Sequence, residues 1–504
     1  MKYAIVVVVF ALSCGEVKEP EGLPRLPPLS AAPLATEQRW GATKPVTPQM
    51  NRPPTNPAQL GWLLDNGFGD VRLVAGLQSS TQTIDGASPP AAGANRKLLL
   101  RFVHLADTQL TDDESPARVV SLDQMGPTSG AFRPQEAWGC HALNAAVRTI
   151  NRVHRDTPID LVMLGGDNID NAQRNEARWF RTVLGGADSL ECDSGDDDDP
   201  TPGPSNDPKD PFHVEGLSVP WRWVTGNHDV LNQGNFPITE QLRAMSKGTE
   251  ASVGTRDGSK PGGGPTTEGP VAADDEREPM NGAELLTFIS DDGDGHGLRT
   301  AGATTDGKAF YAIDVGDSLR LVVLDTAAPT GGSDGLLLRT DVDARVKPLL
   351  DEAEAQGRYV LLFSHHAARA LTDGSGFGGS QQSGAMLTAE WREFLGAYPH
   401  VVMHIAAHSH EYRAGVARPL GGHPFFETES ASLTDWPAQV RMFEVWNEDN
   451  GLLHVRAVPL DFSEENDALA AEFRRRSAAD FTSGWAGATA GDEGAVDFWF
   501  PVVR

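Results

Sequence analysis

Five short polar clusters constrain this chain more than any other feature. Four of the five directly follow a run of apolar and β-branched residues that is typical of a buried strand. Because the carboxyl ends of parallel strands meet at one edge of a sheet, a single site assembled from five chain segments is the simplest account of the pattern. The clusters lie at residues 107–109 (Asp-Thr-Gln), 166–171 (Gly-Asp-Asn-Ile-Asp-Asn), 226–229 (Gly-Asn-His-Asp), 365–366 (His-His) and 408–410 (His-Ser-His).

Strand-like and helix-like segments alternate from residue 97 onward. Residues 98–106 indicate a strand, and within residues 136–155 the side chains of Leu143, Val147 and Ile150 fall on one helical face. This alternation predicts an α/β fold. The later segments indicate helices at 172–184, 342–355 and 389–397 and strands at 159–165, 219–225, 309–315, 319–324, 359–363, 401–406, 423–429, 440–446 and 452–458.

The first 14 residues resemble a bacterial lipoprotein signal. Lys2 supplies a short basic region, residues 3–12 form an apolar stretch too short to span a bilayer, and Cys14 would become the lipidated first residue of the mature protein. An ordinary cleaved secretory signal is the alternative. Under either interpretation the protein leaves the cytoplasm, as a lipoprotein or as a secreted or periplasmic protein. We expect membrane contact only through a lipid on Cys14.

Composition divides the rest of the chain. Residues 15–58 are dense in proline and poor in large apolar groups, which favours an extended tether. The main domain is expected at 59–462, with inserts at about 186–217 and 248–307 that have the acidic and glycine-rich composition of solvated surface segments. Residues 463–504 are expected to form a C-terminal helix and a tail packed on the domain.

The formal net charge of −28 argues against nucleic-acid binding, because the chain has no basic patch that could displace counterions. It argues equally against general binding to an anionic membrane surface. An anionic substrate would therefore need bound cations in order to approach.

Outside the signal segment, Cys140 and Cys192 are the only cysteines. In an oxidising compartment such an even pair favours a disulfide. Two unrelated thiols are the alternative.

The five clusters combine the ligands that a pair of divalent metal ions needs. Two ions about 3.5 to 4 Å apart can polarise a phosphoryl oxygen and activate a water, and they require a carboxylate between them. Asp167 is the best candidate, because it follows an apolar strand and the preceding glycine lets the backbone turn tightly. Asp107, Asn227, His408 and His410 can add oxygen and nitrogen ligands from other strand ends. The pattern indicates a two-metal site of the kind that hydrolyses phosphate esters.

The order and spacing of these clusters resemble the calcineurin-like metallophosphoesterase family, in a bacterial branch with Asp-x-Gln in place of Asp-x-His. The likeness covers about residues 97–459. It implies a four-layer α-β-β-α sandwich of two mixed sheets flanked by helices, with residues 59–462 as the catalytic domain. It also implies a binuclear phosphatase or phosphodiesterase, in which a metal-bridging hydroxide attacks a phosphate mono- or diester.

The resemblance further implies a role for each matching residue. His228 would stand free of the metals, where it would stabilise the transferring phosphoryl group or protonate the leaving oxygen, with Asp170 or Asp229 orienting its ring. The first metal would be held by Asp107, Gln109, Asp167 and His410, and the second by Asp167, Asn227, His365 and His408.

Two residues depart from the family pattern. Gln109 stands where most members have histidine, which exchanges an imidazole nitrogen for a harder and weaker amide oxygen. We therefore expect looser binding at the first site, and a metal preference that moves from zinc toward manganese, magnesium or iron. Ala407 replaces the usual glycine before His408, which is a smaller change.

Some of these residues have a second interpretation. His365 ends its strand and is the expected ligand, whereas His366 would lie near the substrate or act as the ligand instead. Asp170 and Asn171 can also be helix-capping residues.

Four further residues of metal-binding type are interpreted as structural. His104 and His404 lie within apolar strands and are expected to be core histidines or to support ligands. Asp325 and Asp435 also follow strand-like segments, and we interpret both as turn residues.

Two rival functions remain open on the sequence alone. A phospholipid or sphingomyelin-type phosphodiesterase would have an apolar substrate groove beside the inserts. A catalytically silent surface binding protein would keep the fold without turnover, but a purely structural metal site does not need the unliganded His228.

Overall fold

The computed structural model describes residues 23–126, 128–195, 207–251, 269–290, 296–298, 306–486 and 494–502. The expected signal segment with Cys14, the aspartates at 196–199, the glycines at 262–264 and the acidic residues at 291–294 lie outside these ranges. Over the ranges that are described, no helix combines the length and the apolar character that a membrane span requires.

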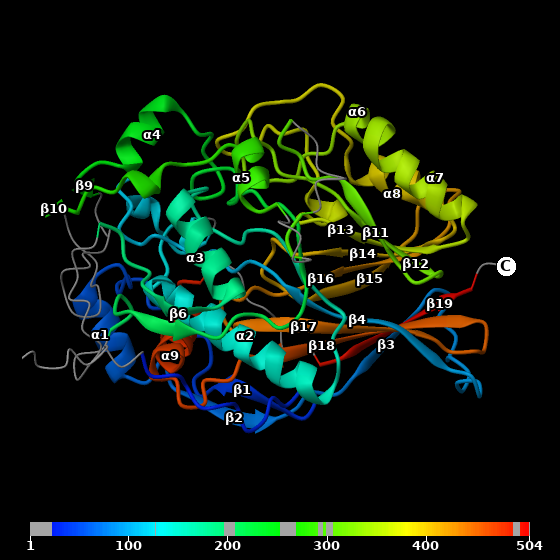
Figure 1. Ribbon diagram of the computed structural model, residues 1–504, viewed down its shortest axis with the longest axis horizontal. Helices are drawn as coiled ribbons and strands as arrows, with labels where there is room; N and C mark the ends of the chain where they lie inside the picture. Colours follow the sequence, from blue (N-terminus) through cyan, green and yellow to red (C-terminus); the bar gives the residue numbers. More distant parts are fainter. Residues whose placement is uncertain are drawn as a thin grey trace, which may run out of the picture.

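Two mixed sheets form the centre of the molecule (Figure 1). In the six-stranded sheet the central strands β12, β13, β14 and β16 run parallel, with the antiparallel strands β11 and β15 at the two edges. Every residue of β12, β13 and β14 is buried, which explains their nearly continuous apolar sequences. The strands, in spatial order, are β11 (Tyr311–Val315), β12 (Leu319–Val323), β13 (Tyr359–Phe363), β14 (Val401–Ala406), β16 (Phe425–Glu429) and β15 (Arg413–Ala417).

The seven-stranded sheet combines a parallel part with an antiparallel part. β4, β5 and β8 run parallel, and β17 and β18 form a long antiparallel pair beside them. β19 lies between β18 and β3, so strands that are far apart in the sequence complete this edge. The strands, in spatial order, are β3 (Ser80–Thr83), β19 (Val496–Pro501), β18 (Leu452–Asp461), β17 (Gln439–Asn447), β4 (Lys97–Leu105), β5 (Leu161–Leu164) and β8 (Trp221–Trp223).

Aromatic side chains join the inner faces of the two sheets. The ring of Phe102 in β4 lies 5.4 Å from that of Phe363 in β13, and the rings of Phe426 in β16 and Phe498 in β19 are 5.1 Å apart. One cluster of buried apolar side chains contains residues of both sheets. This cluster provides the main hydrophobic contribution to holding the sheets together.

Helices cover the outer sides of both sheets. Those of the six-stranded sheet, α6, α7 and α8, lie together above it in Figure 1, and a second apolar cluster joins side chains of α7 and α8 to its strands. The predicted fold, two mixed sheets flanked by helices, is confirmed. The helices are α1 (Pro57–Asp65), α2 (Gly139–Asp156), α3 (Arg174–Gly185), α4 (Glu240–Ser246), α5 (Gly282–Phe288), α6 (Arg339–Asp341), α7 (Lys347–Ala355), α8 (Thr388–Gly396) and α9 (Ala468–Thr482).

Both terminal regions lie against the sheets. From residue 23 onward, the range expected to be a tether contacts the domain: Leu29 and Ala35 are buried, and the backbone N–H of Ala35 donates to the carbonyl of Pro459 in β18 at 3.0 Å. Within the same range β1 (Gln38–Ala42) pairs with β2 (Val71–Ala75). A few apolar side chains and one strand thus anchor a segment whose overall composition is that of an extended linker. At the other end, α9 is the expected C-terminal helix, and the tail forms β19.

The two described ends of the first insert are joined to each other, and a disulfide joins the insert to α2. β6 (Ala187–Leu190) pairs with β7 (Phe212–Val214). Cys192 forms a disulfide with Cys140 of α2, with the Cα atoms 6.7 Å apart, so the favoured pairing is confirmed. In the described part of the second insert, β9 (Glu250–Ala251) pairs with β10 (Gly269–Pro270) ahead of α5.

Each insert delivers a buried cation to the acidic segment that follows the first polar cluster. Lys209 of the first insert lies 2.7 Å from the carboxylate of Asp113 and 3.3 Å from that of Glu114. Arg277 of the second insert donates to the carboxylate of Asp112 at 2.8 Å. All five side chains are almost fully buried, unlike the solvated surface expected for the inserts. Because water cannot compensate these charges, each depends on its partner.

Replacement of Lys209 by methionine is expected to lower the free energy of unfolding by about 3–5 kcal/mol, because it removes the buried cation that lies nearest to the carboxylates of Asp113 and Glu114. Urea denaturation followed by circular dichroism measures the change. Lys347→Met is the matched control, since Lys347 and its partner Asp351 are both about half exposed; this change should stay within about 1 kcal/mol. Equal effects of the two substitutions would contradict the role given to Lys209.

Candidate active site

The predicted metal ligands follow the carboxyl ends of strands from both sheets. In the seven-stranded sheet, the parallel neighbours β4, β5 and β8 end shortly before Asp107, Asp167 and Asn227. In the six-stranded sheet, the parallel neighbours β13 and β14 end shortly before His365 and His408. The facing sheets therefore direct five chain segments to one edge, as the sequence predicts.

The backbone is held in the left-handed region at five of the predicted ligands. The φ angle is 49° at Asp107, 42° at Gln109, 51° at Asp167, 68° at His408 and 56° at His410. Residues other than glycine rarely adopt this conformation, which costs roughly 1–3 kcal/mol at each position. Such strain persists only where the surrounding structure imposes it, and it concentrates at functional sites.

Asp167 lies at the centre of the arrangement. One of its carboxylate oxygens is 3.0 Å from Nε2 of His365 and 3.5 Å from Nε2 of Gln109, and the other accepts a hydrogen bond from the backbone N–H of His228 at 2.8 Å. Burial alone would raise the pKa of Asp167, but the imidazoles of His365 and His228 hold it well below its usual value. The chain also approaches closely here, because a Cβ atom on Gly226 would lie 2.1 Å from the Asp167 carboxylate.

Two histidines aim one ring nitrogen at the carboxylates while a second contact fixes the other nitrogen. Nε2 of His410 lies 3.4 Å from Asp107, and its Nδ1 lies 2.6 Å from the carboxylate of Asp435. Nδ1 of His365 is held by the carbonyl oxygen of Gly165 at 2.9 Å. Burial opposes a charge on either ring, but Asp107 raises the pKa of His410 to about 10 and Asp167 raises that of His365 to about 9. The carboxylates therefore favour a positive charge at Nε2 of each ring, and this is the position at which a metal cation would bind.

Three predicted ligand atoms support this interpretation. Oε1 of Gln109 and Oδ1 of Asn227 are buried and have no hydrogen-bond partner within the described part of the chain. Nε2 of His365 is buried as well and faces the carboxylate of Asp167 at 3.0 Å. The amide of Asn227 is oriented by a hydrogen bond from its Nδ2 to the carbonyl oxygen of Gly234 at 3.0 Å. Buried polar atoms are rarely left unpaired, so these oxygen and nitrogen donors fit a divalent metal site.

His365 and His366 differ in how their nitrogens are used. Each comes close to His408, and ligand atoms of the three rings lie within 4.8 Å of one another. Both nitrogens of His366 have partners, however: Nδ1 lies 2.9 Å from the hydroxyl of Thr326 and Nε2 lies 3.0 Å from the carbonyl oxygen of Ser333. Burial lowers the pKa of His366 to about 3, so its ring is neutral. The geometry therefore favours His365 as the ligand, the choice made from the sequence.

His228 is oriented by Asp170. Its Nδ1 lies 2.9 Å from the Asp170 carboxylate, and its Nε2 is 3.9 Å from Asp167. Although burial opposes protonation, Asp167 and Asp170 raise the pKa of His228 above its ordinary value. Asp229, the alternative orienting residue, instead accepts hydrogen bonds from the backbone N–H groups of Gly226, Asn168 and Ile169, and so it joins two of the polar clusters.

Asp435 makes a contact to the site that the sequence analysis does not predict. It opens a turn, as expected, since the N–H of Ala438 donates to its carbonyl oxygen at 2.7 Å. Its carboxylate also contacts His410 and accepts a hydrogen bond from Nε of Arg133 at 2.8 Å. Burial would raise the pKa of Asp435, but Arg133 and His410 hold it well below its usual value. The sequence signal that could have identified Asp435 is its position after a strand. Asp325 has the same signal, yet its carboxylate accepts hydrogen bonds from the backbone N–H groups of Ala309 and Ala327.

A cleft of about 530 Å³ opens onto these residues. Polar groups of the site, apolar side chains and small polar side chains all contribute to its lining. Its lining comprises Gln109, Val119, Leu122, Thr128, Gly130, Ala131, Arg133, Asp167, Asn227, His228, Gln233, Asn235, Phe236, Ser333, Asp334, Phe377, His408 and His410.

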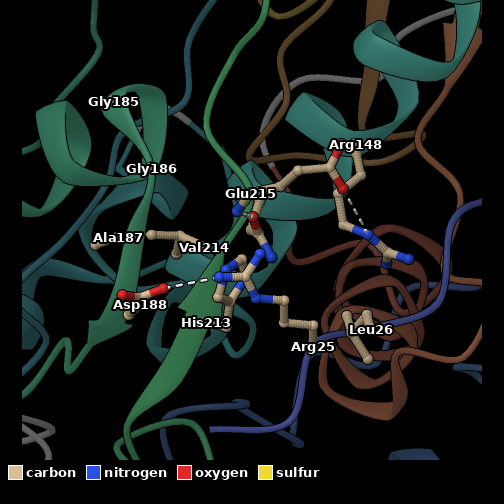
Figure 2. Close-up of a pocket in the computed structure, with 11 residues that line it drawn as sticks. Arg25, Leu26, Arg148, Gly185, Gly186, Ala187, Asp188, His213, Val214 and Glu215 are labelled. Carbon is tan, nitrogen blue, oxygen red and sulfur yellow. Dashed lines mark hydrogen bonds and ion pairs between the residues drawn. The ribbon is translucent and has the colours of Figure 1, made fainter. Parts of the chain in front are cut away.

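A cavity of similar size lies elsewhere and contains none of the predicted ligands (Figure 2). Arg25 and Leu26 of the N-terminal segment line it, together with β6, β7 and Arg148 of α2. Figure 2 shows its charged groups facing one another, with Arg25 and Asp188 2.9 Å apart and Arg148 and Glu215 3.7 Å apart. These internal pairs leave the cleft beside Asp167 as the better candidate for an active site.

Comparison with known proteins gives a consistent family match. The model for the calcineurin-like phosphoesterases matches residues 100–412, more than half of the chain. No curated protein matches significantly. Among solved structures, a dimetal phosphatase from Danio rerio is similar at 13% identity and a TM-score of 0.38, over 73% of this chain and 100% of that one.

Two further solved structures show a likeness of the same order. A purple acid phosphatase from yellow lupin (Lupinus luteus) seeds has 11% identity and a TM-score of 0.35, over 86% of this chain and 58% of that one. The structure of PhoD has 11% identity and a TM-score of 0.33, over 78% of this chain and 72% of that one.

Replacement of Asp435 by asparagine is expected to weaken metal binding by about 10- to 100-fold, because His410 loses the carboxylate that fixes its ring. Titration of the metal-free protein with Mn²⁺, followed by calorimetry, measures the dissociation constant. Asp325→Asn is the matched control, since this buried carboxylate contacts backbone N–H groups and no histidine. Unchanged affinity in Asp435→Asn, or equal losses in both variants, would contradict the assignment.

Proposed function

Because this chain belongs to the calcineurin-like phosphoesterase family, we propose that it hydrolyses a phosphate mono- or diester with two divalent metal ions. The observation that supports this proposal most is the convergence of Asp107, Asp167 and His365, whose ligand atoms lie within 4.8 Å of one another. Asp170 holds the ring of His228 beside them. A carboxylate shared by two metals, Asp167, beside an acid that binds no metal, His228, suits the hydrolysis of a phosphate ester.

The ligand sets follow the sequence assignment. Asp167 would be shared by both metals, which when bound would neutralise phosphoryl oxygens and supply an activated water. The first metal would be held by Asp107, Gln109, Asp167 and His410, and the second by Asp167, Asn227, His365 and His408.

His228 would act on the ester itself. The contact between Asp170 and Nδ1 leaves Nε2 directed into the cleft, where the ring also lines the wall. Asp167 and Asp170 raise the pKa of His228, which favours the protonated ring, and from that ring Nε2 would give a proton to the oxygen that leaves. Asp170 is a positioning residue in this scheme, because it touches His228 and not the ester.

Gln109 sets the expected metal preference. Its amide oxygen is a harder and weaker donor than an imidazole nitrogen, so we expect manganese, magnesium or iron to be favoured over zinc at the first site. The contact of its Nε2 with Asp167 at 3.5 Å orients the amide so that Oε1 is the atom left for the metal.

A catalytically silent binding protein is the rival from another class. The hydrogen bond between His228 and Asp170 counts against it, because a site that only binds metal gains nothing from a second, oriented imidazole. A phospholipid or sphingomyelin-type phosphodiesterase is the rival among enzymes, and the phenyl rings of Phe236 and Phe377 in the cleft favour an apolar contact with substrate. Hydrolysis of a nitrophenyl phosphate and of a bis-nitrophenyl phosphate, with and without Mn²⁺, separates the three.

We expect Asp167→Asn to lose both metals, whereas His228→Ala keeps them and loses about 10²- to 10⁴-fold in turnover, the usual scale for general acid catalysis. Asp167 carries the charge shared by the two sites, whereas His228 contributes only its proton. Elemental analysis of the purified variants gives metal content, and nitrophenyl phosphate hydrolysis gives turnover. The assignments fail if both variants retain two metals equally.

We also propose that the protein acts outside the cytoplasm. The disulfide between Cys140 and Cys192 supports it, because such bonds persist in oxidising compartments. We propose a lipoprotein anchored through Cys14, with ordinary secretion as the alternative.

Cys14→Ser is expected to move the protein from the membrane fraction to the soluble fraction in a bacterial host, because only the lipid would hold it there. Fractionation followed by intact mass measurement detects both the release and the loss of the lipid. Soluble wild-type protein without added mass would instead support an ordinary secretory signal.

A further inference from the structure

Two phenyl rings stand at the mouth of the cleft that contains Asp167 and His228. Phe236 and Phe377 come from separate loops, and their rings meet edge to face with centroids 5.8 Å apart. Phe377 remains 66% exposed, and Leu122, which also lines the cleft, is 38% exposed. Apolar rings left in water beside a polar site indicate a surface that a ligand covers.

The loops that carry these rings both meet a third loop, at Gly331 and Gly332. The N–H of Gly332 donates to the carbonyl oxygen of Asn235, next to Phe236, at 3.0 Å. Gly331 approaches Gly378 so closely that a Cβ atom on Gly331 would lie 2.1 Å from the Gly378 carbonyl oxygen. The position of the aromatic pair is therefore set before any ligand arrives, which lowers the entropy cost of binding.

Asp334 lines the same cleft, and the side chains of Phe236, Phe377 and Asp334 are together called the wall below. Asp334 makes no hydrogen bond or ion pair with any residue that the structure describes, and burial raises its pKa without an opposing contribution. Its loop reaches the metal side of the cleft, since the carbonyl oxygen of Ser333 lies 3.0 Å from Nε2 of His366. Arg133 is the only arginine or lysine in the lining of the cleft, and the carboxylate of Asp435 already holds it.

We propose that this wall binds a leaving group that carries an alkylammonium cation, with its carbon substituents against Phe236 and Phe377 and its charge balanced by Asp334. This inference rests on the proposed function, for which it names the substrate class. Ammonium groups are attracted to aromatic faces within about 6 Å. A neutral apolar leaving group would bury Asp334 without a partner, and an anionic one would be repelled by it.

The reaction conserves every atom. The bond between phosphorus and the leaving oxygen breaks, a water oxygen forms a new bond to phosphorus, and the leaving oxygen takes up a proton from His228. The proton that the water releases restores the one lost by His228, so the net reaction consumes one water. The products are the phosphate and an alcohol that keeps its ammonium group. Asp334 and the two phenylalanines act only in binding, because none of them exchanges a proton or a bond.

A pair of esters of equal shape tests the charge directly. Choline phosphate and 3,3-dimethylbutyl phosphate differ only in having a quaternary nitrogen or a carbon at one position, so the ratio of their kcat/KM values isolates the cation. We expect the Mn²⁺-loaded wild type to favour the cationic ester about tenfold. Titration calorimetry of both esters on His228→Ala, where turnover is slow, should show the same preference in binding.

Three variants divide the preference between its sources. Asp334→Asn removes the charge and keeps the shape, and Phe377→Leu removes the aromatic face and keeps an apolar side chain. Each should lower the ratio to about threefold, and the double variant should bring it near one. Asp343→Asn is the matched control, because this exposed carboxylate lies on the helical segment before α7, away from the cleft, and should leave the ratio as in the wild type.

The outcomes separate this inference from the proposed function. Hydrolysis of nitrophenyl phosphate with equal rates on the two matched esters overturns the inference and leaves the phosphoesterase proposal standing. A full preference retained in Asp334→Asn overturns the role of that carboxylate. No hydrolysis of these three monoesters, nor of bis-nitrophenyl phosphate, with any metal overturns both proposals.

Discussion

The structure depends on a carboxylate that is fully buried and still charged. Asp167 stays ionised only because imidazoles from both sheets face it, and the chain reaches this arrangement through left-handed backbone at five predicted ligands. Such conformations are costly, and the aromatic contacts between the sheets provide the rigid frame that imposes them. The main hydrophobic core therefore holds the carboxylates and imidazoles of the site within a few ångströms of one another. Divalent cations, when bound, would relieve the repulsion between the carboxylates of Asp107 and Asp167.

Much of the fold could be predicted from local sequence. The strands β13 and β14 have the predicted bounds, and most other predicted strands and helices differ by one to three residues. β13 and β14 are buried on both faces, so their sequences are long apolar runs whose ends are marked by polar clusters. The position of the site at the strand ends follows from the same pattern. The metal ligands themselves remain predictions, although the structure brings all seven together.

Other features depend on contacts between distant segments, which local patterns do not encode. The charges of Lys209 and Arg277 lie in sequence stretches typical of solvated loops, yet both are buried against the acidic segment after the first cluster. Asp435 opens a turn, as its sequence predicts, and only the fold shows that it also holds His410. The proline-rich segment before residue 58 is similar: Leu29 and Ala35 fix it to the domain, although its average composition indicates a linker. In each case a few long-range contacts add a role that the local composition does not encode.

The placement of β19 affects how this chain can acquire its structure. β3 pairs only with β19, and β19 in turn covers β18, so an early strand has no hydrogen-bonding neighbour until residues 496–501 have been made. During synthesis, the nascent chain would carry β3 unpaired and β18 as an open edge, which is the form most exposed to aggregation and proteolysis. A chaperone that shields extended segments would be most useful at this stage. Shortening the chain before residue 496 would make the vulnerable intermediate permanent, even though every predicted ligand would still be present.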